Sequence, residues 1–197
     1  MSENIFTKRR EPFTFMLYVG IGGSGLLFFV IFLLFLKKEF NNVDIKIVVP
    51  GAMWLSTLLI VLSSMAMNAS IRKINDQNFG TFRQWLTFSY LLGFFFVFSQ
   101  IIAWIKLLNK STLGLSQNIG TAFLFILSLL HVIHTVLGLI AFTLILKKAF
   151  KNNSYVDSLV YSVNPPNILN LSLLSKFWHF LSVLWIIIFL FLMYHAS

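Results

Sequence analysis

Five long stretches of the chain contain no Asp, Glu, Lys or Arg. The hydrocarbon core of a bilayer is about 30 Å thick, and a helix needs about 20 residues to cross it. Each stretch reaches that length, whereas strands of a membrane barrel would be about half as long and would alternate in polarity. The sequence therefore predicts an all-α polytopic membrane protein with five transmembrane helices, at residues 13–36, 47–71, 84–105, 119–146 and 177–197.

The composition agrees with lipid as the solvent. Hydrophobic residues make up 58% of the 197 residues and charged residues only 11%, with a mean hydropathy of +0.85. Soluble domains are closer to half apolar and about a quarter charged. The connections are too short to form further domains, so we expect a single five-helix membrane domain over residues 1–197. The chain has no cysteine, which removes disulfides, thiolate catalysis and Cys-ligated metal sites.

The charged residues all lie between or beyond the apolar stretches. The six acids are Glu3, Glu11, Glu39, Asp44, Asp76 and Asp157. A carboxylate inside the membrane would be the usual sign of an ion or proton pathway, so the sequence argues against a pump or ion-coupled transporter that works alone. The net charge of +9 comes from short basic clusters. Such clusters in a membrane protein set topology and meet anionic headgroups, so we expect no nucleic-acid partner.

The basic residues also predict an orientation. With the N-terminus in the cytoplasm, ten of the 15 Lys and Arg residues lie on the inner side: Lys8, Arg9, Arg10, Arg72, Lys73, Arg83, Lys147, Lys148, Lys151 and Lys176. The outer segments then hold Lys37, Lys38, Lys46, Lys106 and Lys110. Because cytoplasmic loops carry an excess of Lys and Arg, we predict a cytoplasmic N-terminus and a C-terminus on the opposite side.

Neutral polar and small residues recur within the spans at helical spacing, which puts them on one face of each helix. They are Gly20, Ser24 and Gly25 in the first span; Ser89, Gly93, Gln100 and Trp104 in the third; Ser128, His131, His134, Thr135 and Gly138 in the fourth; and Trp178, His179, Ser182, Trp185 and Phe189 in the fifth. We interpret these faces as surfaces for helix packing, lipid or subunit contact, since small residues let helices approach and polar side chains hydrogen-bond across them.

The histidines allow a second interpretation. The spacing of His131 and His134 places two imidazoles on one face, which would suit a metal ion, and a haem could be held between His131 and His179. A zinc site usually needs a third ligand and a nearby carboxylate, and no acid lies at that depth. We therefore favour packing and predict no metal site. The sequence also shows no nucleophile–base pair, so we predict no catalytic residue.

The last span carries the most specific motif. Residues 177–185, which begin Phe177-Trp178-His179-Phe180, resemble the signature that opens the last helix of subunit III of the haem–copper oxidases. Other segments are similar to that family in the same order: residues 24–29, 50–64, 83–100 and the paired-histidine segment 130–138. The resemblance covers all five spans and matches the short, five-helix bacterial form of the subunit.

The resemblance implies an accessory subunit III in the bacterial cytoplasmic membrane. Such a subunit has no redox centre of its own, packs beside subunit I, belongs with subunit II to a complex or larger supercomplex, and binds phospholipid. The haem and copper lie in partner subunits, which couple O2 reduction to proton pumping. We expect the cytochrome c oxidase type. The alternatives are subunit III of a quinol oxidase, a homologue associated with nitric oxide reductase, a small b-type cytochrome and a membrane transporter.

Three positions depart from the family pattern. The family usually has carboxylates where this chain has Gly25, Ala103 and Ser182. Helix packing does not need those carboxylates, so the inferred fold stands, but their proposed proton-collecting role is not carried over. We expect Gly25 instead to support a close backbone contact or a lipid contact.

Overall fold

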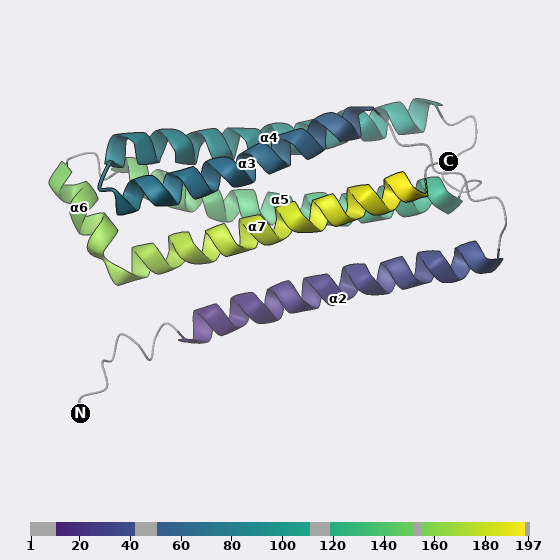
Figure 1. The fold of residues 1–197 in the computed structure, drawn as a ribbon, viewed down its shortest axis with the longest axis horizontal. Coiled ribbons are helices and arrows are strands. Elements are labelled where there is room, and N and C mark those ends of the chain that lie inside the picture. The colour runs from purple at the N-terminus through teal and green to yellow at the C-terminus, as the bar shows by residue number, and fades with distance from the viewer. Residues whose placement is uncertain (1–10, 42–50, 111–118, 152–154, 196–197) are drawn as a thin grey trace.

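The computed structural model describes residues 11–41, 51–110, 119–151 and 155–195, and all elements in these ranges are helices. As the sequence predicts, five of them are long and apolar enough to cross a membrane. These are α2 (Glu11–Asn41), α3 (Ala52–Asn75), α4 (Phe79–Lys110), α5 (Ile119–Lys151) and α7 (Pro165–Tyr194). Successive long helices run in opposite directions, so α2 begins and α7 ends at opposite ends of the bundle (Figure 1).

Four of the five helices are longer than the apolar stretches that predicted them, and α3 extends beyond its stretch at the C-terminal end. The predicted spans leave residues 72–83 as a connection, but in the structure α3 continues to Asn75 and α4 begins at Phe79. Lys and Arg can extend their charged ends toward the headgroups, so a basic residue ends an apolar stretch without ending the helix. Residues 47–50 of the predicted second span lie outside the described residues, and α3 begins after Gly51.

The predicted spans also leave residues 147–176 as a connection before the last span, and the structure shows helices in most of it. The segment contains the end of α5, a short helix α6 (Tyr155–Val163) and the first turns of α7, which begins at Pro165 instead of Phe177. Asn164 is extended, and two prolines occupy the first positions of α7. Proline suits these positions because it lacks an N–H that would have no partner in the first turn. The Asn-Pro-Pro sequence therefore separates α6 from α7 and also starts α7.

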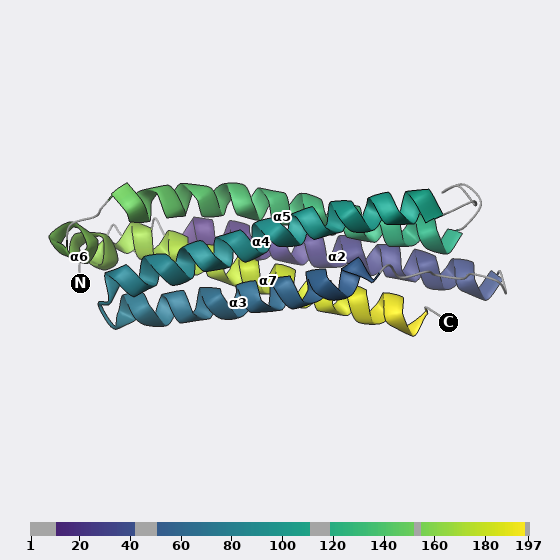
Figure 2. The same ribbon diagram turned by 90° about the horizontal axis from the view of Figure 1, so that it is seen from above.

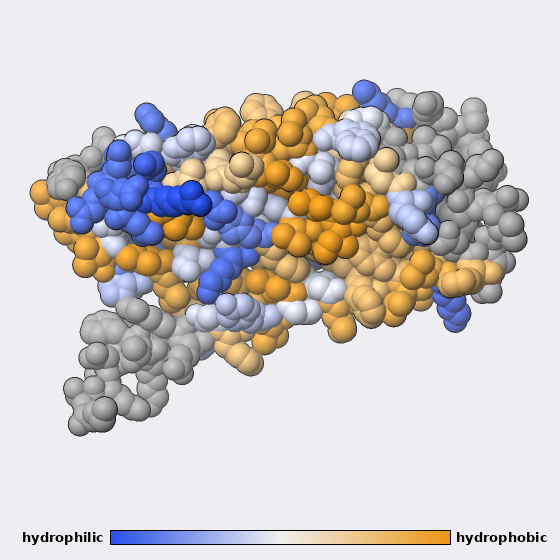
Figure 3. Space-filling view, in the orientation of Figure 1, coloured by the Kyte–Doolittle hydropathy of each residue, from blue (hydrophilic) through white to orange (hydrophobic). Residues whose placement is uncertain are grey.

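Four of the long helices, α3, α4, α5 and α7, pack into one group, and α2 lies along one side of it (Figures 1 and 2). In their most apolar stretches, 33–44% of the residues of these four helices are buried, compared with 11% in α2. We call α3, α4, α5 and α7 the four-helix group. Figure 3 shows an extensive hydrophobic surface over the middle of the molecule, with hydrophilic residues gathered toward the α6 end.

The closest pair of helices, α3 and α4, meets along a seven-residue repeat. Buried residues of α3 recur at steps of three and four: Met53, Ser56, Ile60, Ser63, Met67, Ser70 and Ile74. Those of α4 do the same: Phe82, Leu86, Ser89, Gly93, Phe96, Gln100, Ala103 and Leu107. Such a repeat keeps one stripe of each helix facing its partner. The serines in the stripe are small, so the two backbones approach closely.

Candidate functional site

Trp178 of α7 lies at the centre of the four-helix group and has no exposed surface. Its indole Nε1 donates a hydrogen bond to Ser63 Oγ of α3 at 2.9 Å. A Cβ built on Gly93 of α4 would lie 2.8 Å from Trp178 Cη2 and nearer still to Cζ2, and one built on Gly138 of α5 would lie 3.2 Å from Cζ3. The ring therefore contacts all three other helices of the group, and it leaves no room for a Cβ at position 93 and little at position 138.

Ser63 also joins α3 directly to α4. Its hydroxyl donates to the carbonyl of Ser89 at 2.7 Å, and the Ser89 hydroxyl donates to the carbonyl of Ser63 at 2.8 Å. Both side chains are fully buried. Because Ser63 Oγ accepts from Trp178 while it donates to Ser89, one hydroxyl connects three helices.

A second buried cluster lies two helical turns further along α7, around Trp185. Trp185 Nε1 donates to Thr57 Oγ1 of α3 at 3.0 Å, and its ring packs against Phe96 of α4 and His131 of α5, at centroid distances of 5.1 and 5.0 Å. His131 Nε2 donates to the carbonyl of Leu181 at 2.9 Å. A carbonyl can only accept, so this contact assigns the proton to Nε2. His131 thus connects α5 to the backbone of α7.

The other two predicted histidines lie toward the edge of the group. His134 donates from Nδ1 to the carbonyl of Leu130 at 2.8 Å, which leaves Nε2 to accept from Ser24 of α2 at 3.1 Å. His179 Nε2 lies 2.8 Å from Asn68 Oδ1, and its Nδ1 lies 2.6 Å from Ser64 Oγ, both on α3. Both ring nitrogens of each side chain are therefore used in bonds within the protein.

This arrangement gives the interpretation as metal or haem ligands no support. The histidine nitrogens that a metal would need face backbone carbonyls, an amide and hydroxyls. Among the described residues, no three His, Cys, Asp or Glu side chains lie close enough together to hold a metal ion. In the structure these side chains hydrogen-bond to other helices and to the backbone.

The remaining predicted residues of α4, α5 and α7 also lie between helices. Gln100 Nε2 donates to Ser56 Oγ at 2.6 Å, and Trp104 Nε1 donates to Ser128 Oγ at 2.9 Å. Ser182 is buried and bonds to the Trp178 carbonyl of its own helix at 2.9 Å. Gln100 Oε1 is the single buried side-chain oxygen or nitrogen in the described part of the chain that has no partner.

The glycines of α2 lie differently. A Cβ added at Gly20, Gly22, Gly23 or Gly25 would meet nothing within 4 Å. The expected close backbone contact at Gly25 is therefore not made within this chain, because α2 approaches the four-helix group through other residues. Phe28 and Phe35 are buried, and the Phe32 ring lies 4.6 Å from that of Phe191. Contact of the glycines with lipid or another subunit stays a prediction.

Several residues of α3 that hydrogen-bond to the predicted side chains were not identified from the sequence. Asn68 was assigned no role, and the hydroxyls that accept from the tryptophans and Gln100 were seen only as part of a family resemblance. The available signal was the repeat of Ser56, Ser63 and Ser70 at intervals of seven, which marks one packed stripe.

These observations define the class of protein: a five-helix membrane protein whose polar residues join helices and whose outer surface is apolar. No family model matches the chain, but named relatives do. The chain is 28% identical over 137 residues to cytochrome bo(3) ubiquinol oxidase subunit 3 of Buchnera aphidicola subsp. Baizongia pistaciae, a match that covers 70% of this chain and 66% of the relative.

Two further relatives extend the comparison. The subunit of the same name from Buchnera aphidicola subsp. Acyrthosiphon pisum is 24% identical over 90% of this chain and 83% of its own length. A probable cytochrome c oxidase subunit 3 of Mycobacterium bovis is 25% identical over 68% of this chain and 61% of its own. The homologues of this chain are thus subunits III of haem–copper oxidases, of both the quinol and the cytochrome c type, and the resemblance drawn from the sequence is confirmed. The chain matches just under two thirds of the length of the first of these relatives.

Proposed function

We propose that this chain is the accessory subunit III of a respiratory haem–copper terminal oxidase of the cytochrome c type. In this role it stabilises the catalytic subunit I and binds lipid, while the redox centres for O2 reduction and proton pumping lie in partner subunits. The observation that carries the proposal is the double role of residues 177–185. The segment that resembles the family signature is also the one whose Trp178 and Trp185 join all four helices of the group.

The proposed role is structural because the residues in the spans are suited to packing. Of the three positions where the family usually has a carboxylate, Ala103 and Ser182 are buried between helices and Gly25 is open. None of the three carries a carboxyl group that could take up and release a proton. Carbodiimide, which reacts with protonated carboxyls, should therefore leave the spans of this subunit unlabelled.

The open face of α2 is the proposed contact with subunit I or with lipid. It combines glycines that nothing in this chain covers with exposed apolar side chains such as Leu26 and Phe29. Small residues allow a second helix to come close. If subunit I occupies this face, Gly25→Leu should weaken co-purification with subunit I while the four-helix group stays folded.

We further propose the cytoplasmic membrane of a bacterium, with the N-terminus inside. The α3–α4 turn and α6 lie at the same end of the bundle as the start of α2 (Figure 1). That end therefore gathers Arg72, Lys73, Arg83 and Lys151, which supports a cytoplasmic location for it. Lys8, Arg9, Arg10 and Lys46 of the original count lie outside the described residues. A reporter that is active only in the periplasm should work when fused after Ser197 and fail when fused before Phe13; the reverse result would overturn the orientation.

The decisive experiment is affinity purification of the tagged full-length chain in mild detergent from its own membranes. We expect subunits I and II to co-purify and the complex to oxidise reduced cytochrome c. Oxidation of quinol instead would favour the quinol oxidase alternative, which the Buchnera relatives keep open. Trp178→Ala should abolish co-purification, whereas Phe98→Ala, an exposed control on α4 outside the proposed contact face, should not. A chain that purifies alone with a stoichiometric haem Soret band, lost in His131→Ala, would make it a b-type cytochrome.

A further inference from the structure

A series of hydrogen bonds between α3 and α7 reaches the surface of the bundle at Asn68. Ser64 and His179 are half-buried, whereas Asn68 is exposed. Asn68 Oδ1 lies 2.8 Å from His179 Nε2 and can only accept, so Nε2 donates and Nδ1 accepts from Ser64 Oγ at 2.6 Å. The amide nitrogen of Asn68 makes no bond to any described residue. The series therefore ends in two unused N–H donors on an exposed side chain.

Asn68 lies at a depth where lipid offers no acceptor for these donors. Arg72, the first basic residue after the apolar stretch of α3, is four residues further along the helix, so Asn68 is about 6 Å deeper in the membrane. His179 has the same relation to Lys176 of α7, three residues away. Acyl chains accept no hydrogen bonds, and an unpaired amide in hydrocarbon is costly. The exposed amide is therefore better suited to a polar group of a second protein than to lipid.

The surface around this amide is largely apolar. Residues at steps of three, four or seven from Asn68 and His179 share their side of each helix. We call this surface the α3–α7 face: Met65, Asn68 and Arg72 of α3 with His179, Val183 and Leu190 of α7. Its three apolar side chains are 55–63% exposed, and Figure 3 shows hydrophilic residues reaching from the α6 end along α3 and α7 into the hydrophobic surface. Such a face suits a second membrane helix, which can pack on the apolar part and hydrogen-bond at the polar part.

The charge on the α3–α7 face favours an acidic partner. Arg72 is exposed and makes no bond to any described residue. The neighbouring Lys73 Nζ lies 3.3 Å from the Asp76 carboxylate, so that carboxylate is already paired. Lys176 adds a second cation beside the face, although its ammonium donates to Tyr18 Oη of α2 at 3.1 Å. Arg72 is therefore the cation that remains for a carboxylate of another chain.

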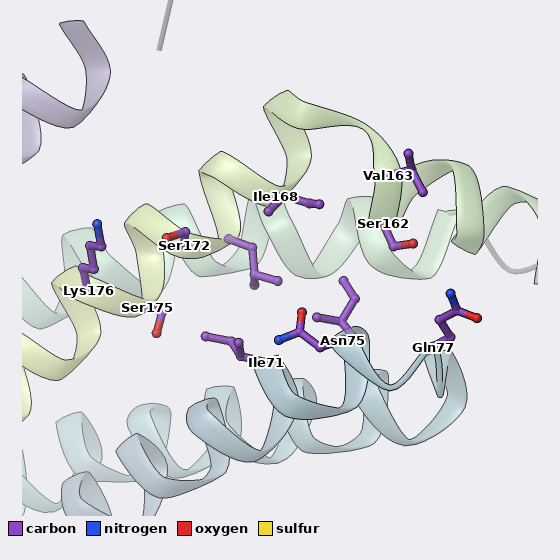
Figure 4. A pocket seen from close by; sticks show the side chains of 11 residues that line it. Ile71, Asn75, Gln77, Ser162, Val163, Ile168, Ser172, Ser175 and Lys176 are labelled. Atoms are coloured by element: carbon purple, nitrogen blue, oxygen red, sulfur yellow. The ribbon is translucent and has the colours of Figure 1, made fainter. Parts of the chain in front are cut away.

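A cavity separates Asn68 from α6. It has a volume of about 460 Å³ and lies between α3, α6 and α7, on the α6 side of the bond between Asn68 and His179 (Figure 4). Asn75 lines it from α3, and Ser172 and Ser175 line it from α7. Asn68 is not part of this lining and lies on open surface. A partner helix along the α3–α7 face can therefore reach Asn68 without displacing α6.

We propose that the α3–α7 face is a docking surface for a transmembrane helix of a partner subunit. That helix carries a carboxylate at its α6 end, which pairs with Arg72, and about one turn deeper a hydroxyl or amide oxygen that accepts from Asn68. Its apolar side chains pack against Met65, Val183 and Leu190. This inference deepens the proposed function and rests on it for the existence of a partner subunit, but the contact is separate from the open face of α2.

Photo-crosslinking in native membranes tests the surface. The photoreactive residue p-benzoylphenylalanine replaces Val183 of the tagged full-length chain or, as a matched control, Phe98 of α4. Both positions are 55% exposed, but Phe98 is two residues from the buried Phe96 and lies on the other side of α4. Mass spectrometry should identify, from position 183 alone, a crosslinked peptide in a transmembrane helix of a co-purifying subunit. The proposal is overturned if position 183 captures only lipid, or no more protein than position 98.

Substitutions of Asn68 separate contact with protein from contact with lipid. Asn68→Leu makes the surface more apolar, which suits lipid, yet it should lower the retention of the partner subunit in detergent washes about threefold, as for one hydrogen bond between membrane helices. Asn68→Asp keeps the oxygen that accepts from His179 and removes only the free donors, so it should act similarly. The double change Asn68→Leu and Arg72→Gln should lower retention about tenfold. Unchanged retention in a folded double variant would contradict the proposal.

Gln84→Leu is the matched control, because it removes an exposed amide from α4 at the same end of the bundle. It should retain the partner subunit as the wild type does, and circular dichroism verifies that each variant is folded. Co-purification of subunit I with the wild type is measured first and tests the proposed function by itself. If no subunit co-purifies, both ideas fail. If subunit I co-purifies and the double variant retains it fully, only the docking surface is wrong.

Discussion

α2 and the four-helix group are both apolar, but they bury very different shares of their surface. The most apolar stretch of α2 has a mean hydropathy of 2.5, higher than the 1.5–2.3 of the other four helices, yet only 11% of it is buried. In water, the most apolar segment would lie deepest in the core. In a bilayer the lipid is as apolar as another helix, so apolarity brings no helix inside. Burial here depends on complementary shape and on hydrogen bonds.

The glycines of the two regions show the same contrast. Gly93 and Gly138 face the rings of Trp178 and Phe177, while the glycines of α2 face nothing in this chain. A small residue permits a close contact, but the contact forms only where a bulky side chain of a neighbouring helix fills the space. α2 instead contacts the four-helix group through three phenylalanines on its second half, Phe28, Phe32 and Phe35.

The largest expected effect is that of Trp178→Ala. The change leaves a cavity between four helices and removes one hydrogen bond to Ser63, so it should destabilise the folded chain by about 3 kcal/mol. The corresponding change on α2, Phe29→Ala, removes a ring that is 56% exposed and should cost less than about 0.5 kcal/mol. Titration of the purified chain with sodium dodecyl sulfate, followed by circular dichroism, measures both. Equal effects would contradict the division into a packed group and an attached helix.

Gly93→Ala tests the role of shape most directly. The added methyl group overlaps the buried Trp178 ring, which has no room to move, so we expect destabilisation of about 1–3 kcal/mol. The same change at Gly25 adds a methyl group in open space and should change stability by less than about 0.5 kcal/mol. Detergent-unfolding midpoints of the two variants provide the comparison. If Gly93→Ala is as stable as the wild type, the contact with Trp178 is looser than the structure indicates.

Phe35→Ala should release α2 without unfolding the four-helix group. Phe35 is 1% exposed and packs against Phe123 and Phe191, with centroids 5.1 and 5.2 Å away. Its loss should weaken the attachment of α2 by about 1–2 kcal/mol, less than for a soluble core because lipid replaces part of the contact. Hydrogen exchange should rise in peptides of residues 11–41 and stay unchanged in α5. Raised exchange in both would mean that α2 and the group unfold together.

The smallest expected difference is that between Ser63→Ala and Ser24→Ala. Ser63 takes part in bonds to Trp178 and Ser89, and polar contacts between membrane helices average about 0.6 kcal/mol each, so its removal should cost about 1 kcal/mol. Ser24 makes one half-buried contact with His134 and should cost about 0.6 kcal/mol or less. The same detergent titration resolves the two. A larger effect at Ser24 would give α2 a greater share in stability than its burial suggests.

Much of the fold could be predicted because the membrane imposes simple rules. The number of spans follows from the length and apolarity of each stretch, and the stripe of Ser128, His131 and Thr135 does lie inside the group. The ends of the helices were predicted less well, since Lys147 and Arg72 end an apolar stretch but lie within helices. A pair of prolines usually marks a turn or the end of a helix, but Pro165 and Pro166 begin α7.

The sequence by itself determined the solvent, the five spans and the polar face of each packed helix, because these depend on composition and on the geometry of a single helix. Only the tertiary structure decided which faces meet. It placed Trp178 between Gly93 and Gly138, left the glycines of α2 uncovered, and brought Asn75 and Ser175 to one cavity. The physical reason is that lipid covers the apolar surface of a helix about as favourably as another helix does. The choice between lipid and helix therefore rests on shape and hydrogen bonds between residues far apart in the chain.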